Sequence, residues 1–337
     1  MKRGESGLSF VVGVDKPAGM TSHDVVNRCR RVFGEKRVGH TGTLDPMASG
    51  VLPICVGPAT RLASYLTAHD KSYRASIKFG FETDTDDACG SSIRSASVPE
   101  QLSDEAFARN YLSELLGEHL QMPPAYSAIK VGGRKACDEA RAGRIIELKP
   151  RPIEVMQADL RGIETSPDDG NPTWVVDFRV SKGTYIRALA RDIGRDLGTC
   201  AHLEALRRLV SGSLSVEDCV SLETLSELGQ RAALDPVRLL GCRFLYADGA
   251  LASVVGNGNM LEGGAVALFE YAKTSAEAQI SACTSGVRES ARLADDGEVV
   301  AVIADNKLVA LYSFDQRRAR FKPCCVFQTG VLRGSDI

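Results

Sequence analysis

The sequence predicts an α+β fold, an enzyme-like body of mixed strands and helices followed by a small β domain. Two observations lead to this prediction. Alternating and 3.6-residue apolar patterns follow one another through the first 240 residues. Beyond that point the chain holds short β-like runs, such as VVAVIA (299–304) and KLVALYSF (307–314), separated by Gly, Asp and Asn. We therefore expect one domain over residues 8–240 and a small β-rich domain over residues 245–330.

The first elements are a strand and a helix. LSFVVGVDKP (8–17) predicts a buried strand that ends at Pro17. Residues 21–33 predict a helix with Thr21 or Ser22 as its N-cap, because apolar side chains recur on one face. The loop GHTGTLDPMASG (39–50) follows, and it places a single carboxylate among turn residues. Gly, Asp, Thr and Pro are common in turns, so the loop by itself indicates no more than a tight turn.

The middle of the chain alternates between strands and helices. Residues 72–80 alternate and predict a strand, and TDTDDACG (83–90) predicts an acidic turn. Residues 103–117 predict a capped amphipathic helix that ends at Gly117. Residues 121–143 begin with two prolines, so we expect an extended start and a short helix at the end.

Two further strands, 153–164 and 173–183, are expected around the turn SPDDGNP. Residues 184–198 predict a helix with its leucines and isoleucine inward and its arginines outward. The segment 179–208 carries seven basic residues against three acidic ones. It is predicted to be either a basic surface or an ordinary solvated helix face.

Composition excludes several classes of protein. Hydrophobic residues make up 44% and charged residues 25%, the balance of a globular protein, and no apolar run is long enough for a membrane span. The basic start MKRGESGLSF has no apolar core of a signal peptide. Ten scattered cysteines without a C-x-x-C pair favour reduced thiols, and five histidines without ligand spacing argue against a structural zinc site. We therefore expect a cytoplasmic protein.

Several long motifs, in a fixed order along the chain, resemble those of a known protein family. The segments KPAGMTS, GHTGTLDPMASGVLPICVGPATR, QMPPAYSAIKVGGRKACDEARAG and SKGTYIRALARDIGRDLGTCAHLEALRRLVSG, with the strand of Tyr73 and its acidic turn, resemble the TruB family of tRNA pseudouridine synthases over roughly residues 8–215. The resemblance implies the pseudouridine synthase catalytic fold, a mixed and mainly antiparallel sheet flanked by helices and loops. It implies an isomerase that detaches a uridine in RNA at its glycosidic bond and rejoins it through C5. No metal or organic cofactor is implied.

Three catalytic residues follow from the resemblance. Asp45 is the expected nucleophile, Arg187 matches the family's active-site arginine, and Tyr73 matches the tyrosine that stacks on the base. A carboxylate attacks only when it is ionised, and a nearby guanidinium favours that form. Pro46 restricts Asp45 to extended backbone angles and so stiffens the loop. The alternatives are a turn aspartate, a surface arginine and a core tyrosine.

Further residues are expected to bind the RNA. His40 matches the histidine that takes the place of the flipped base, Asp87 is expected to anchor the flipped nucleotide, and Tyr185 and Leu206 are expected to line the pocket. A hydrogen-bonding histidine, a turn aspartate and plain core residues are the alternatives. Phosphate contacts, which would offset the cost of base flipping, are expected from Lys16, Lys130, Arg141, Arg207 and Arg208.

The resemblance also suggests the parts of the molecule that bind RNA. Residues 121–150 resemble the family's RNA-gripping insertion. Members of the family often end in a PUA or PUA-like RNA-binding domain, which residues 245–330 match in size and β character, although the region is acidic and carries no sharp signature. Residues 213–337 hold 12 Lys and Arg against 16 Asp and Glu. The expected partner is the T-arm of tRNA, with no membrane, no obligatory protein partner and a monomeric state.

Three functions remain open from sequence. The leading one is a stand-alone enzyme that converts the T-loop uridine at tRNA position 55. The second is a guide-RNA-dependent H/ACA-type synthase subunit, against which the segment 121–143 argues. The third is a non-catalytic RNA-binding or RNA-refolding protein, against which intact Asp45, Tyr73 and Arg187 argue. A nucleotide-binding switch lacks its G-x-x-x-x-G-K-[ST] motif.

Overall fold

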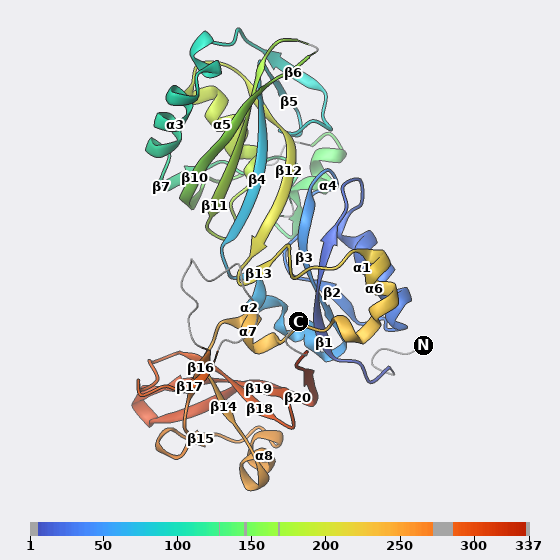
Figure 1. Cartoon of the computed structure of the whole chain (residues 1–337), viewed down its shortest axis with the longest axis vertical. Helices are drawn as coiled ribbons and strands as arrows, with labels where there is room; N and C mark the ends of the chain where they lie inside the picture. Colours follow the sequence, from blue (N-terminus) through green and yellow to red (C-terminus); the bar gives the residue numbers. More distant parts are fainter. Residues whose placement is uncertain (1–5, 128, 145–146, 168, 272–285, 335–337) are drawn as a thin grey trace.

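A nine-stranded sheet forms the centre of the larger part of the protein (Figure 1). The computed structural model describes residues 6–127, 129–144, 147–167, 169–271 and 286–334. The sheet runs in the order β1 (Phe10–Lys16), β3 (Ser49–Val56), β12 (Ala201–Ser211), β4 (Lys71–Phe79), β11 (Pro172–Val180), β10 (Arg151–Thr165), β7 (Gly117–Gln121), with β2 (Val38–His40) on β3 and β13 (Leu214–Ser215) on β12. The β3–β12 contact is parallel and the other pairings in this sheet are antiparallel. The prediction of a mixed, mainly antiparallel sheet is confirmed.

The helices cover this sheet at two places. Helices α3 (Glu105–Glu114) and α5 (Ile186–Asp196) pack near β10 and β12, whereas α1 (Ser22–Phe33) and α6 (Leu222–Leu228) lie beside β1 and β2 (Figure 1). The shorter helices are α2 (Ala63–Thr67), α4 (Ala136–Arg141), α7 (Pro236–Leu240) and α8 (Gly249–Gly256). Helix α1 begins as expected, because Thr21 and Asp24 form a capping box.

Most predicted elements are present. The strands expected over 8–17, 72–80, 153–164 and 173–183 correspond to β1, β4, β10 and β11. The helix expected over 103–117 is shorter, because α3 ends at Glu114 and Gly117, with a φ of +113°, opens β7 instead. Strands β2, β3 and β12 are not predicted from the sequence, although β3 and β12 lie inside the sheet. Their apolar runs are flanked by glycine-rich or basic segments, which conceal the strand pattern.

The parallel contact between β3 and β12 creates the place where functional segments meet. Arg208 of β12 lies opposite Tyr73 of β4 on one side and opposite Gly50 of β3 on the other. The loop 41–48 enters β3 just before this contact. Gly50 has a φ of +102°, and a Cβ added there would lie 2.1 Å from the Arg208 carbonyl oxygen. A side chain at this position is therefore incompatible with the close approach of the two strands.

The C-terminal part is a second sheet of seven strands. Its order is β15 (Leu261–Glu262), β20 (Arg320–Leu332), β19 (Lys307–Asp315), β18 (Val299–Ala304), β14 (Phe244–Tyr246), β16 (Phe269–Tyr271) and β17 (Val287–Glu289). Figure 1 shows this sheet at the end of the molecule next to β1 and α7. The predicted β character of the region is confirmed.

The two sheets share a hydrophobic cluster. Buried side chains from the first part pack with buried side chains from the second, and the cluster includes Val11, Cys55, Leu62, Leu66, Phe244, Ile303, Leu311 and Phe327. Polar contacts add to it: Leu332 N–H donates to the Ser9 carbonyl at 2.8 Å, and Arg61 donates to the Val326 carbonyl at 2.6 Å. Removal of residues 245–337 would expose this cluster to water, so point substitutions test the C-terminal region better than truncation.

Among the described helices, none combines the length and apolar character needed to cross a membrane.

Candidate active site

The loop that carries Asp45 is fixed on both sides of the carboxylate. The Ser22 hydroxyl accepts from Leu44 N–H and donates to the Leu44 carbonyl, both at 2.9 Å. The Pro46 carbonyl accepts from Gly19 N–H at 2.8 Å and from the Lys16 ammonium at 3.3 Å. The residues before and after Asp45 are therefore held to α1 and to the turn that follows β1.

Two cations lie inside the protein rather than on its surface. Lys16 is fully buried and donates to the carbonyls of Met20 at 2.6 Å and Pro17 at 2.9 Å. Burial lowers the pKa of Lys16 to about 8, and nearby Asp45 opposes that shift. Arg208 is 1% exposed and donates to the carbonyls of Val51 at 2.6 Å and Gly42 at 3.1 Å. The expectation that these two side chains contact phosphates is corrected, because burial directs both cations to main-chain carbonyls.

Arg187 joins the loop that carries Asp45 to two other segments. Its Nε lies 2.8 Å from Asp45 Oδ2, and its Nη2 donates to Oδ1 at 3.2 Å. The same guanidinium donates to the carbonyls of Thr85 at 2.8 Å and Tyr126 at 2.9 Å. The Asp45 side chain is 33% exposed, whereas that of Arg187 is 5% exposed. A buried cation thus holds a carboxylate that remains open to a reactant.

Asp87 is a turn aspartate, one of the two alternatives that the sequence left open, and it also lies beside Arg187. One carboxylate oxygen accepts from the Thr85 hydroxyl at 2.7 Å and from Cys89 N–H at 3.0 Å, as in a turn. The other oxygen lies 3.6 Å from Arg187 Nη1. Asp87 therefore shapes the acidic turn and also adds negative charge beside the Arg187–Asp45 pair.

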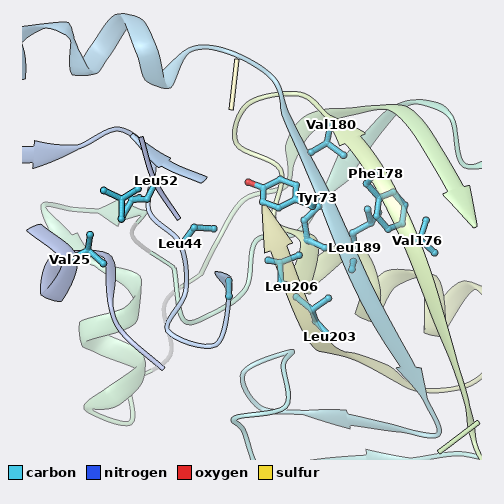
Figure 2. Close-up of a cluster of buried hydrophobic side chains, with 14 of the residues drawn as sticks. Val25, Leu44, Leu52, Tyr73, Val176, Phe178, Val180, Leu189, Leu203 and Leu206 are labelled. Atoms are coloured by element: carbon cyan, nitrogen blue, oxygen red, sulfur yellow. The ribbon is translucent and has the colours of Figure 1, made fainter. Parts of the chain in front are cut away.

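Tyr73 and Leu206 lie in the buried cluster beneath this loop. Both are 8% exposed, and they belong to one cluster with Leu44. Figure 2 shows the Tyr73 ring beside Leu206 and Leu189, with its hydroxyl directed away from Phe178 toward the side on which Leu44 lies. Among the described residues no hydrogen-bond partner is found for this hydroxyl. The ring is thus part of the core, whereas its polar end faces the loop that carries Asp45.

Tyr185 and His40 flank the same region. Tyr185 is the N-cap of α5, and its main-chain N–H and carbonyl both bind the Gln121 side chain, at 2.9 and 3.1 Å. Burial raises the pKa of the Tyr185 hydroxyl. His40 ends β2, and burial together with the Arg208 charge lowers its pKa, so the neutral ring is favoured near pH 7. Its Nδ1 is buried without a partner in the described part of the chain.

Most cations of the predicted basic segment are paired rather than free, although some stay exposed. Five arginines bind acidic partners: Arg179 with Asp70, Arg187 with Asp45, Arg191 with Asp86, Arg195 with Glu82 and Arg207 with Asp15. The expectation that the α5 arginines point outward is wrong for Arg187 and Arg191, which are 4% and 7% exposed. Arg207 stays partly exposed beside Asp15. The backbones of Lys130 and Arg141 lie in β8 (Lys130–Val131) and α4, but their side chains lie outside the described residues.

Several site residues were not found from sequence. Ser22 was considered only as a helix cap, and Gln121 and Arg191 were not singled out. The spacing of Arg187, Arg191 and Arg195 at every fourth residue was a usable signal, because acidic residues at 82, 86 and 87 could face them. No group of three or more His, Cys, Asp or Glu side chains in the described ranges could hold a metal ion.

Comparisons with known proteins agree with this geometry. Residues 30–186 match the model for the TruB family pseudouridylate synthase N-terminal domain, and residues 187–240 match the model for the tRNA pseudouridylate synthase B C-terminal domain. The chain is 42% identical over 290 residues to a protein of Mycolicibacterium paratuberculosis named tRNA pseudouridine synthase B, covering 85% of this chain and 94% of that one. A protein of the same name from Caldanaerobacter subterraneus is 44% identical and covers 67% of this chain and 76% of its own length.

Solved structures extend the similarity to the whole fold. A crystal structure of a Cbf5-Nop10-Gar1 complex matches with a TM-score of 0.65 at 24% identity, over 95% of this chain and 83% of that one. An archaeal box H/ACA sRNP Nop10-Cbf5 complex matches with a TM-score of 0.63 at 22% identity, over 96% and 86%. At these identities the similarity concerns the fold alone.

Proposed function

The chain belongs to the TruB family of pseudouridine synthases, and from this premise we propose that it is a stand-alone enzyme that converts the T-loop uridine at tRNA position 55 to pseudouridine. The observation that supports the proposal most is the pairing of Asp45 with Arg187. A partly open carboxylate on a fixed loop, held by a buried guanidinium, is the arrangement that nucleophilic catalysis needs.

The proposed reaction is an isomerisation within one nucleotide. The bond between C1′ and N1 of uridine breaks, the base turns, and a bond forms between C1′ and C5. N1 gains a proton and C5 loses one, so the atoms balance without an oxidant, a reductant or a cofactor. Asp45 is the nucleophile, and Arg187 holds its carboxylate in a fixed orientation. The Tyr73 hydroxyl points from the core toward the side on which Leu44, the neighbour of Asp45, lies.

The target base must leave its stack before the glycosidic bond can be reached, at a cost of a few kcal/mol. We assign the Tyr73 ring and Leu206 to the apolar contact with the flipped base and His40 to the position that the base vacates. A neutral histidine ring suits that position, because it can stack between bases without bringing a charge. Residues 121–150 are assigned to gripping the RNA around the flipped nucleotide, with Lys130 and Arg141 proposed as phosphate contacts.

Two other functions are less well supported. A guide-RNA-dependent synthase resembles this chain in fold, but only at identities below 25%. The relatives named tRNA pseudouridine synthase B match at above 40% identity over most of the chain. A non-catalytic RNA-binding protein would not need a partly exposed Asp45 carboxylate held by a buried Arg187.

Tritium release from an unmodified tRNA transcript tests the proposed function. Uridine labelled at C5 loses its tritium to water only when C5 forms the new bond. We expect the protein alone, without guide RNA, to release tritium from the T-loop uridine at position 55. A transcript with cytidine at that position is the control and should release none from that site. Release that requires a guide RNA would instead identify the guided enzyme.

The C-terminal region is proposed to add phosphate contacts through the turn between β19 and β20. Arg317 and Arg318 are exposed there, in an otherwise acidic region, while the nearby Lys322 pairs with Asp315. We expect the Arg317→Gln/Arg318→Gln variant to weaken tRNA binding and to reduce the slope of log affinity against log salt by about 1–2. The matched control is Arg288→Gln/Arg292→Gln, which removes two cations already paired with Glu270 and Asp295. Equal slopes for the two variants would remove this turn from the RNA interface.

A further inference from the structure

Three arginines on successive turns of α5 face three acidic side chains. Arg187 pairs with Asp45, as described above. Arg191 Nη1 lies 2.8 Å from Asp86 Oδ2, and Arg195 binds Glu82 through two bonds of 2.9 and 2.7 Å. The Asp86 and Glu82 side chains are 12% and 2% exposed. The helix is thus attached to β5 (Phe81–Thr83) and to the acidic turn that follows it.

The first two arginines have a second kind of partner. Arg191 Nη2 donates to the Met122 carbonyl at 2.9 Å, as Arg187 Nη2 does to the Tyr126 carbonyl. These carbonyls belong to the first residues of the insertion, 122–126, which we call its root. Pro123 and Pro124, which lie between them, have no N–H to donate. The position of this segment therefore depends on groups that bind its carbonyls, and Arg195 binds none of them.

We propose that Arg191 is a positioning residue that holds the root of the insertion and the acidic turn in one fixed arrangement against α5. Its planar fork binds the Asp86 carboxylate and the Met122 carbonyl at the same time. Arg187, one turn earlier, binds the same two segments and also Asp45. Helix α5 thereby fixes the position of the insertion relative to Asp45, the proposed nucleophile. The kinetic part of this inference rests on the proposed function, whereas its structural part does not.

Asp86 is an unusual partner, because its backbone has a φ of +61°. Non-glycine residues adopt this conformation at a cost, so the turn keeps it only when other contacts fix it. Burial raises the pKa of the Asp86 carboxyl, and the Arg191 charge opposes that effect. Loss of the Arg191 guanidinium would leave a buried carboxylate without its cation and release the turn next to Asp87.

Limited trypsin digestion of the full-length protein tests the structural part without RNA. The exposed Arg134 and Arg144 offer cleavage sites within the insertion. We expect Arg191→Gln to speed cleavage at these sites about tenfold, because the root loses a charged hydrogen bond. Arg195→Gln is the matched control: it removes an arginine from the same helix and leaves a buried acid, but it touches no carbonyl of the root. Its cleavage rate should stay within about twofold of wild type.

The kinetic part uses tritium release from unmodified tRNA. We expect Arg191→Gln to raise KM about tenfold with kcat changed less than threefold, whereas Arg195→Gln leaves both nearly unchanged. If Arg191→Gln and Arg195→Gln change the cleavage rate equally, the inference is overturned. If Arg191→Gln is cleaved rapidly but keeps the wild-type KM, the proposed link between the root of the insertion and RNA binding is overturned. An inactive wild-type protein would refute the proposed function but leave the trypsin comparison intact. If Arg191→Gln does not fold, Arg191→Lys keeps a cation beside Asp86 but cannot bind Asp86 and the Met122 carbonyl at the same time, and the same outcomes apply.

Discussion

Replacement of Asp45 by asparagine is expected to lower tritium release from tRNA by roughly 10⁴-fold or more. Asparagine has the shape of aspartate, and its amide oxygen can still accept from Arg187, so the loop should stay in place. An uncharged amide does not attack a sugar or a base as a carboxylate does. The loss should therefore appear in kcat, and tRNA binding should stay within about threefold.

The matched control for this variant is Asp177→Asn. Like Asp45, Asp177 pairs with arginine: its carboxylate lies 2.8 Å from Arg74 and 2.7 Å from Arg161. It lies on β11, far in sequence from the loop that carries Asp45. Its replacement removes one paired carboxylate from the same sheet and should leave the rate of tritium release nearly unchanged. If Asp45→Asn released tritium at the wild-type rate, Asp45 would be only a turn residue.

The tight turn of the loop 39–50 was predictable because its signals are local. Glycines, threonines and the Asp-Pro pair mark a turn within twelve residues, whereas its relation to Tyr73 and Arg187 followed only from the resemblance to the family. The capping box of α1 and the β10–β11 hairpin were predictable for the same reason. Each of these features depends on residues that are close together along the chain.

The errors concern cations that are buried in the folded chain, most of them with partners distant in sequence. Arg208 looks like an RNA-binding cation, yet it is buried on the carbonyls of Val51 and Gly42, which lie 157 and 166 residues away. Lys16 is buried on the nearby carbonyls of Pro17 and Met20 and on the more distant one of Pro46. Arg191 was expected in solvent because helix periodicity alone assigns charged residues to the exposed face. Its acidic partner lies 105 residues away, so only the combined spacing of the helix arginines and of the distant acidic residues could indicate the pair. Whether a cation is buried depends on partners from other parts of the fold, and the periodicity of one helix carries no information about them.

The second large effect is expected from substitution of Arg187. Its fork holds Asp45 with two nitrogens and binds the Thr85 and Tyr126 carbonyls with the same group. Lysine keeps the positive charge but offers one ammonium on a flexible stem, so it cannot satisfy these partners together. We expect Arg187→Lys to lower kcat by about 10²–10³-fold, because the carboxylate loses its aim while its charge remains compensated.

Arg195→Lys is the control, since Arg195 also binds a carboxylate through two parallel bonds on the same helix. Substitution of the buried Arg187 should cost about 1–3 kcal/mol in denaturant unfolding and that of the half-exposed Arg195 less, because a buried group that loses a partner costs more. Only Arg187→Lys should lose catalysis, and it should do so in kcat with little change in KM. The Arg191→Gln variant is expected to show the opposite pattern, a raised KM with little change in kcat. Arg187 and Arg191, on adjacent turns of α5, would then act on the chemical step and on RNA positioning, respectively. Equal kcat for Arg187→Lys and Arg195→Lys would mean that Arg187 stabilises the fold without aiming the nucleophile.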